Sequence, residues 1–232
     1  MEFQFQFGAV FARSDLLLEG LLQTLQLAGT AIVFGGLLGI LLAGIRSLAP
    51  RPVGVLIDIY VELIRNTPFL VQLLIIYFGL PSIGMKLTAE QAALIGLVVY
   101  LGAYVTEIVR AGIESVHRSQ IEAGLSLALT RWQVFRYIVL APAIARVWPA
   151  LASQFVLVTL ATSVCSFISV QELSAQASNI ESDTFRSFET YITVALIYLA
   201  LALVLRGLLA GLGALAFPAG SGLGRLRGQS GA

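Results

Sequence analysis

Five long apolar stretches constrain this 232-residue chain more than any other feature of its sequence. A bilayer core about 30 Å thick is crossed by a helix of about 20 mostly apolar residues. Backbone groups in lipid must pair within a helix or a closed barrel, and nothing here alternates with the period of a barrel strand. The sequence therefore predicts an all-α membrane protein with five transmembrane helices. We place them at residues 16–45, 66–85, 88–109, about 147–170 and 188 to about 215.

The composition agrees with lipid as the surrounding solvent. Only 12% of the residues are charged and 58% are hydrophobic, whereas about a quarter of the residues in a soluble domain are charged. The net charge of +1 gives no electrostatic basis for binding nucleic acid. Cys165 is the only cysteine, and one cysteine does not make a metal site. We expect membrane lipid as a partner, and neither a metal nor another cofactor in this chain.

The basic residues predict which side of the membrane each connection faces. Arginines gather after the first span, after the third span and in the C-terminal tail. Because short cytoplasmic connections are enriched in Lys and Arg, we expect these three regions in the cytoplasm. Residues 1–15 would then be a periplasmic N-terminal segment, and residues 16–217 one transmembrane domain. The glycine-rich residues 218–232 would be a disordered cytoplasmic tail.

The longest cytoplasmic connection, at about residues 119–142, has a pattern of its own. Ile121, Leu125 and Leu129 recur every four residues, which predicts a short amphipathic helix lying across the membrane face. Trp132 and Tyr137 are residue types that favour the membrane interface, where the chain would re-enter lipid. On these residues alone, a simple connector between the third and fourth spans is an equally good interpretation.

Charged residues form two stripes at the cytoplasmic ends of neighbouring segments. Spacings of three and four residues bring side chains within reach on one helix, and ionisable groups near the membrane usually pair or serve transport. We therefore predict an ion-pair ladder, in which Glu62 lies near Arg110. Arg65 would lie near Glu107 in the same ladder, and direct contact with a substrate is the alternative. The stripes are Asp58, Glu62 and Arg65, and then Glu107, Arg110, Glu114 and Arg118.

The fourth span carries a row of hydroxyl side chains on an otherwise apolar helix. Such small polar residues often hold membrane helices together, and they can also line a path for a polar solute. Both interpretations remain open for this row and for a neighbouring amide. The candidate path residues are Gln154, Thr159, Thr162, Ser163 and Ser166.

The 119–142 connection resembles the E-A-A loop shared by permease subunits of bacterial type I ABC importers. In that pattern, E-A-A is followed by a glycine, then an isoleucine, then L-P. Gly124 replaces the second alanine, Ala128 stands where the glycine is expected, and Pro142 comes one residue late. The resemblance implies that this loop couples the spans to a separate ATPase. The coupling residues would be Glu122, Ala123, Gly124, Ala128, Ile138 and Leu140.

Three further blocks are similar to the polar amino-acid branch of this family, at residues 60–73, 104–113 and 168–173. The resemblance implies a non-enzymatic permease of the bacterial inner membrane that works by alternating access. Its partners would be a second permease, identical or homologous, two copies of an ABC ATPase and a periplasmic amino-acid-binding protein. Lys86, the only lysine, follows Met85 rather than a glycine, so the chain has no P-loop. The partner ATPase would therefore bind ATP and Mg.

The fourth span also bears on the charge of the substrate. In relatives that carry cationic amino acids, an acidic residue precedes the T-S pair of this span, whereas Ala161 occupies that place here. We therefore expect a neutral or acidic amino acid, or a partner permease that supplies the whole site. The alternative class of function is an ion-coupled secondary transporter of small solutes. Such transporters usually show internal repeats and an ionisable site at the midplane, and neither is evident in this sequence.

Overall fold

The computed structural model describes residues 5–217, so the predicted tail at 218–232 lies outside the described residues. Within that range every regular element is helical, in agreement with the predicted all-α class. The elements are α1 (Phe7–Phe11), α2 (Ser14–Leu48), α3 (Arg51–Arg65), α4 (Phe69–Leu74), the π-helical η1 (Ile75–Gly79), α5 (Leu80–Ser82), α6 (Ala89–Glu114), α7 (Arg118–Ser126), α8 (Arg131–Gln133), the π-helical η2 (Val134–Val139), α9 (Leu140–Ala161), the 3₁₀-helical η3 (Thr162–Ile168), α10 (Leu173–Thr184) and α11 (Ser187–Ala216).

Four helical segments of the described chain are long and apolar enough to cross a membrane, and a bent pair brings the total to as many as five. The candidates that form a single segment are α2, α6, α11 and the continuous run Arg131–Ile168. This last run begins well before residue 147, where the sequence predicts the fourth span to start. Thr130 explains the earlier start, because it forms a capping box with Gln133 and so begins a helix at Arg131.

The second span differs from the single helix expected over residues 66–85. Arg51–Arg65 and Phe69–Ser82 form a pair bent by 106°. Pro68 disfavours a helical conformation at the preceding residue, and the amide of Gln72 satisfies backbone groups at the break. Its Nε2 donates to the carbonyls of Ile64 at 2.7 Å and Thr67 at 3.0 Å. Residues 51–65, which the sequence places in a connection, are therefore helix α3.

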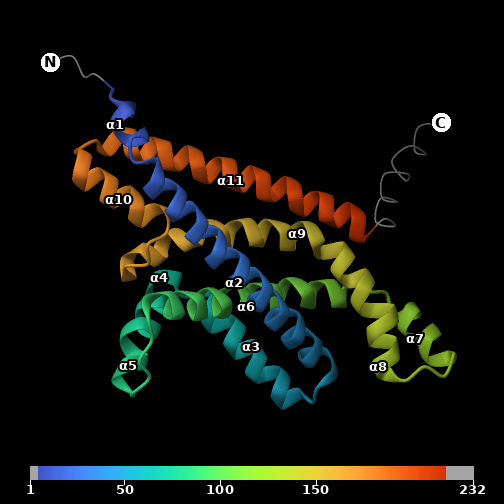
Figure 1. Ribbon diagram of the computed structural model, residues 1–232. Coiled ribbons are helices and arrows are strands. Elements are labelled where there is room, and N and C mark those ends of the chain that lie inside the picture. Colours follow the sequence, from blue (N-terminus) through green and yellow to red (C-terminus); the bar gives the residue numbers. More distant parts are fainter. Residues whose placement is uncertain (1–4, 218–232) are drawn as a thin grey trace, which may run out of the picture.

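α6 is the centre of the packed core and lies against α2, α3 and α9 (Figure 1). Leu97, Leu101 and Val105 are completely buried along it. Small residues let the helices approach closely, as is usual in membranes. A Cβ on Gly39 of α2 would lie 2.5 Å from the Cβ of Val105, so only glycine fits at this crossing.

The two ends of the bundle carry different short helices. α1 and α10 lie at the end where α2 begins, and α7 and α8 lie at the opposite end (Figure 1). α10 packs against α2 and α11, and α1 packs against α11. α9 and α11 run antiparallel to one another along the length of the bundle (Figure 1). The candidate coupling loop leads into the start of the continuous helical segment Arg131–Ile168, and the candidate substrate path lies in its second half.

Candidate functional site

The candidate coupling loop consists of α7 and the first turns of the following span. Gly124, on α7, is buried against η2, and a Cβ at this position would lie 2.5 Å from Cδ1 of Ile138. Ile138 and Leu140 pack on a small apolar cluster that includes Val134 and Phe135. Three of the predicted coupling residues, Gly124, Ile138 and Leu140, thus lie at the junction that holds α7 onto the fourth span.

The remaining coupling candidates face outward. Glu122 and Ala123 are exposed on α7, and the apolar side chain of Leu127 is 76% exposed. Ala128 has a φ of +59°, in the left-handed region that favours glycine. This turn brings the N–H of Leu129 to the carbonyl of Gly124 at 3.3 Å. The backbone conformation gives a physical reason for the glycine that the E-A-A pattern has at this position.

The charged stripes form a partial ladder between α2, α3 and α6. Arg110 binds Glu107 through two hydrogen bonds of 2.7 and 2.9 Å, and Glu114 through one of 2.6 Å. Arg65 lies 3.7 Å from Glu107, as predicted. Among the described residues, Glu62 and Arg118 take part in no ion pair, so Glu62 does not pair with Arg110 or Arg65.

Asp58 has a partner that the sequence stripes did not include. Nε and Nη2 of Arg46, near the end of α2, donate to the two carboxylate oxygens of Asp58 at 2.9 and 3.0 Å. The two hydrogen bonds fix the relative orientation of the two side chains, in addition to the attraction between their charges. The pair closes the short turn between α2 and α3, so the ladder begins one helix earlier than the sequence predicts.

The hydroxyl row on the fourth span is divided by a change in helix type. α9 ends at Ala161 and the chain continues as the 3₁₀ helix η3. Thr159 and Thr162 are buried, and both donate to backbone carbonyls of their own helix. Ser163 and Ser166 eclipse one another, as residues three apart do in a 3₁₀ helix. These two serines line a cavity of about 630 Å³ together with polar residues of the following segment, Ser169, Gln171, Ser174, Ser178 and Asn179.

Gln154 lies away from that cavity. It is buried in α9, and among the described residues its Nε2 has no hydrogen-bond partner. The structure therefore brings Ser163 and Ser166 together at a cavity and places Gln154, Thr159 and Thr162 in the helix packing.

Glu172, within the block 168–173, is a buried polar residue that the sequence does not single out. It caps α10, where its Oε1 accepts the N–H groups of Ser174 at 2.8 Å and Ala175 at 3.0 Å. The hydroxyl of Tyr198, on α11, donates to Oε2 at 2.5 Å. Burial raises the pKa of this carboxyl, and the hydrogen bonds oppose that shift only in part. The partner Tyr198 is 26 residues away, so no local spacing rule identifies it.

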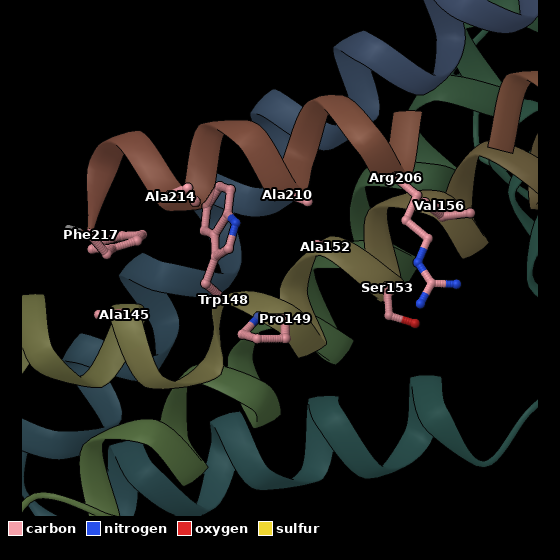
Figure 2. Close-up of a pocket in the computed structure, with 11 residues that line it drawn as sticks. Ala145, Trp148, Pro149, Ala152, Ser153, Val156, Arg206, Ala210, Ala214 and Phe217 are labelled. Carbon is pink, nitrogen blue, oxygen red and sulfur yellow. The ribbon is translucent and has the colours of Figure 1, made fainter. Parts of the chain in front are cut away.

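A second cavity, which the sequence does not predict, lies between α9 and α11 (Figure 2). It has a volume of about 810 Å³ and includes Arg206 and Ser153 in its lining. Trp148 lies at one end, and its Nε1 donates to the carbonyl of Leu209 at 2.9 Å. Gly213 makes room for this ring, since a Cβ there would lie 2.2 Å from Nε1.

Comparison with known families decides the class of protein. Residues 35–214 match the family model described as "Binding-protein-dependent transport system inner membrane component". The chain belongs to this family. The permease resembles the glutamine transport system permease protein of Escherichia coli strain K12, with 34% identity over 87% of this chain and 93% of that protein. A probable glutamine ABC transporter permease protein of Bacillus subtilis strain 168 is 35% identical over 84% of this chain and 91% of that protein.

A solved structure agrees. The permease superposes on a chain of an amino acid ABC transporter crystallised with histidines, with a TM-score of 0.84 and 36% identity over 91% of this chain and 99% of that one. The predicted resemblance to ABC permeases of the polar amino-acid branch is thereby confirmed. The permease is a multi-pass inner-membrane, non-catalytic component of a binding-protein-dependent ABC transport system. This family membership replaces the alternative of an ion-coupled secondary transporter.

Proposed function

We propose that this permease imports a neutral or acidic amino acid by alternating access. It works as a dimer with an identical or homologous permease, and two copies of an ABC ATPase bind ATP and Mg on its cytoplasmic side. A periplasmic amino-acid-binding protein delivers the substrate at the other side. The similarity to glutamine permeases supports the amino-acid class of the substrate.

One observation carries the proposal about substrate charge. Ala161 stands immediately before Thr162 and Ser163, and residues 146–171 contain no carboxylate. A cationic side chain that leaves water without a counter-charge pays several kcal/mol or more. Ser163 and Ser166 donate to the carbonyls of Leu160 and Ser163 at 2.8 Å, and their hydroxyl oxygens can still accept a hydrogen bond from a substrate amide. A cationic substrate is therefore disfavoured along this helix.

Uptake by the reconstituted complex tests the substrate charge. We expect glutamine or glutamate to be taken up in preference to arginine, and Ala161→Asp to raise the relative uptake of arginine. Ala161→Asn is the matched control, because it adds similar bulk without the charge. The proposal fails if arginine is the preferred substrate of the unsubstituted complex and its uptake also falls in Ser163→Ala and Ser166→Ala, the two positions of the row that line the cavity.

Coupling through α7 is the second part of the proposed mechanism. Glu122 and Ala123 face outward at the end of the molecule where α7 lies, and Gly124 packs closely on Ile138. An arginine at position 124 has to displace η2 or push α7 away from it, so we expect Gly124→Arg to abolish substrate-stimulated ATPase activity or to release the ATPase. Gly8→Arg, on α1, is the control, because a Cβ there has no neighbour within 4 Å and the residue does not have a positive φ. Normal stimulation and transport in Gly124→Arg would refute the coupling role.

A further inference from the structure

Arg206 is a charged residue deep within the last membrane-spanning helix. It is the only charge of α11 after Glu189. It lies ten residues before Ala216, the end of the helix, a distance of about 15 Å at 1.5 Å per residue. A 30-residue helix is about 45 Å long and the hydrocarbon core about 30 Å thick. Arg206 therefore lies inside the core when α11 is centred in the bilayer.

The side chain of Arg206 is exposed and, within the described residues, forms neither a hydrogen bond nor an ion pair. An arginine at this depth is costly, and such residues usually face a water-filled cavity or pair with a counter-charge. Arg46 and Arg110 bind carboxylates, and Arg146 donates to the carbonyl and hydroxyl of Ser115. Arg206 is thus a charge for which residues 5–217 provide no counter-charge.

Arg206 opens into the 810 Å³ cavity between α9 and α11. Figure 2 shows the side chains of Arg206 and Ser153 extending from the two helices into the same space. Most of the other lining residues are apolar, with Trp148 and Phe217 toward one end. Volumes of about 300–1,000 Å³, apolar walls and a few placed polar groups are typical of sites for small molecules.

This cavity and the serine-lined cavity lie along one face of the fourth span. Ala152 and Val156 line the first cavity and Ser163 lines the second. Their spacings of four and seven residues place all three on one stripe of a helix. Val156 and Ser163 are seven residues apart, so the two cavities are separated by about 10 Å along the axis. The cavity next to the serine-lined one along this stripe is thus the one that Arg206 lines from α11.

We propose that Arg206 is a substrate-binding residue, which contacts a carboxylate of the amino acid after it has passed Ser163 and Ser166. The inference rests on the proposed function and extends it, because it names a second subsite. Guanidinium binds carboxylate through two parallel hydrogen bonds, which suits a group carried by every amino acid. A lipid phosphate fits less well, since it lies outside the hydrocarbon core at which Arg206 sits.

The test is uptake of glutamine and glutamate by the intact reconstituted complex, with KM and maximal rate measured separately. We expect Arg206→Gln to raise KM for both, on the order of tenfold, the effect of losing a charge-assisted contact. The increase should be larger for glutamate, which carries a second carboxylate. Arg206→Lys should restore part of the affinity. Leu208→Gln, a polar substitution at a lipid-exposed position of the same helix, should leave KM unchanged.

Two results would overturn the inference. An unchanged KM in Arg206→Gln would remove Arg206 from the substrate path. Loss of the second permease on copurification of Arg206→Gln would instead assign the residue to contact between permeases. Failure of the proposed function would be recognised separately, because the unsubstituted complex would then prefer arginine to glutamine and glutamate or would take up no amino acid.

Discussion

Arg65 on α3 reaches Glu107 on α6, with 3.7 Å between Nη1 and Oε1. The same guanidinium lies over the ring of Tyr104, 5.4 Å from its centroid. Glu107 also accepts two hydrogen bonds from Arg110, one turn further along α6. Glu107 is therefore the point at which the bent helix pair is joined to the central helix by charge.

Because Glu107 is shared, we expect a measurable but small coupling energy between Arg65 and Glu107. Both side chains are partly exposed, which limits such a pair to about 1 kcal/mol or less. A double-mutant cycle with Arg65→Gln and Glu107→Gln, read from thermal unfolding of the purified complex, gives this energy. The matched cycle with Glu62→Gln and Arg110→Gln should be additive. Coupling in the second cycle and none in the first would contradict this pairing.

The ladder also shows what the spacing of charges can and cannot predict. Spacings of three and four predict two pairs within one helix, of which Arg110–Glu114 forms and Glu62–Arg65 does not. Pairs between helices depend on how each helix is rotated, and this is why Arg65 finds Glu107 while Glu62 remains outside the ladder. The pair of Arg46 with Asp58 was not predicted, because it joins two helices that only two residues separate in the sequence.

Hydropathy predicted the membrane class and the positions of α2, α6 and α11 from the sequence. A long uncharged run in lipid forms a helix, because its backbone groups have to pair within the segment. It did not predict the bend at Pro68 or the start of the fourth span at Arg131. Charged residues such as Asp58 and Arg136 lower the hydropathy of segments that are nonetheless helical. Arg206 interrupts the apolar run of the last span in the sequence, but the cavity that it lines depends on packing between α9 and α11.

Ala128 provides a test of backbone strain in the coupling loop. Its φ of +59° costs an L-residue about 1–2 kcal/mol, whereas glycine adopts it freely and loses more entropy on folding. We expect Ala128→Gly to raise the stability of the loop by about 0.5–1 kcal/mol. Thermal unfolding of the complex, or proteolysis within α7, measures the change. Gly84→Ala is the opposite control, since Gly84 has a φ of +92° and the substitution should destabilise.

Topology is the third prediction. The arginine asymmetry places the N-terminus in the periplasm and the C-terminus in the cytoplasm. Reporter fusions at Ser82 and Ser178 should therefore score as periplasmic, and a fusion at Arg131 as cytoplasmic. The two ends of the bundle separate α10 from α7 and α8, so these sites sample opposite ends (Figure 1). A periplasmic signal at Arg131 would reverse the orientation.

Glu172 offers the last prediction, because its carboxyl joins the start of α10 to α11. Glu172→Leu removes the acceptor for two backbone N–H groups and for Tyr198, and buried groups left unpaired cost about 1–3 kcal/mol each. We expect a marked loss of thermal stability in this variant at every pH. Glu172→Gln should be far milder, since its amide oxygen still accepts the two N–H groups and the tyrosine hydroxyl can accept from the amide nitrogen.

The pH dependence separates these two variants from a general packing defect. Burial raises the pKa of Glu172 above its ordinary value of 4.5, so the folded protein binds this proton more tightly than the unfolded chain. The resulting stabilisation is complete below pH 4.5 and is lost as pH rises through the folded pKa. The unsubstituted protein should thus lose stability relative to Glu172→Gln as pH rises above 4.5.

Glu181→Gln is the control of opposite sign. Hydrogen bonds from Ser187 and Tyr191 lower the pKa of Glu181, so the stabilisation that Glu181 contributes is lost as pH falls. A constant difference between Glu172→Gln and the unsubstituted protein across this range would show that Glu172 does not change protonation on folding.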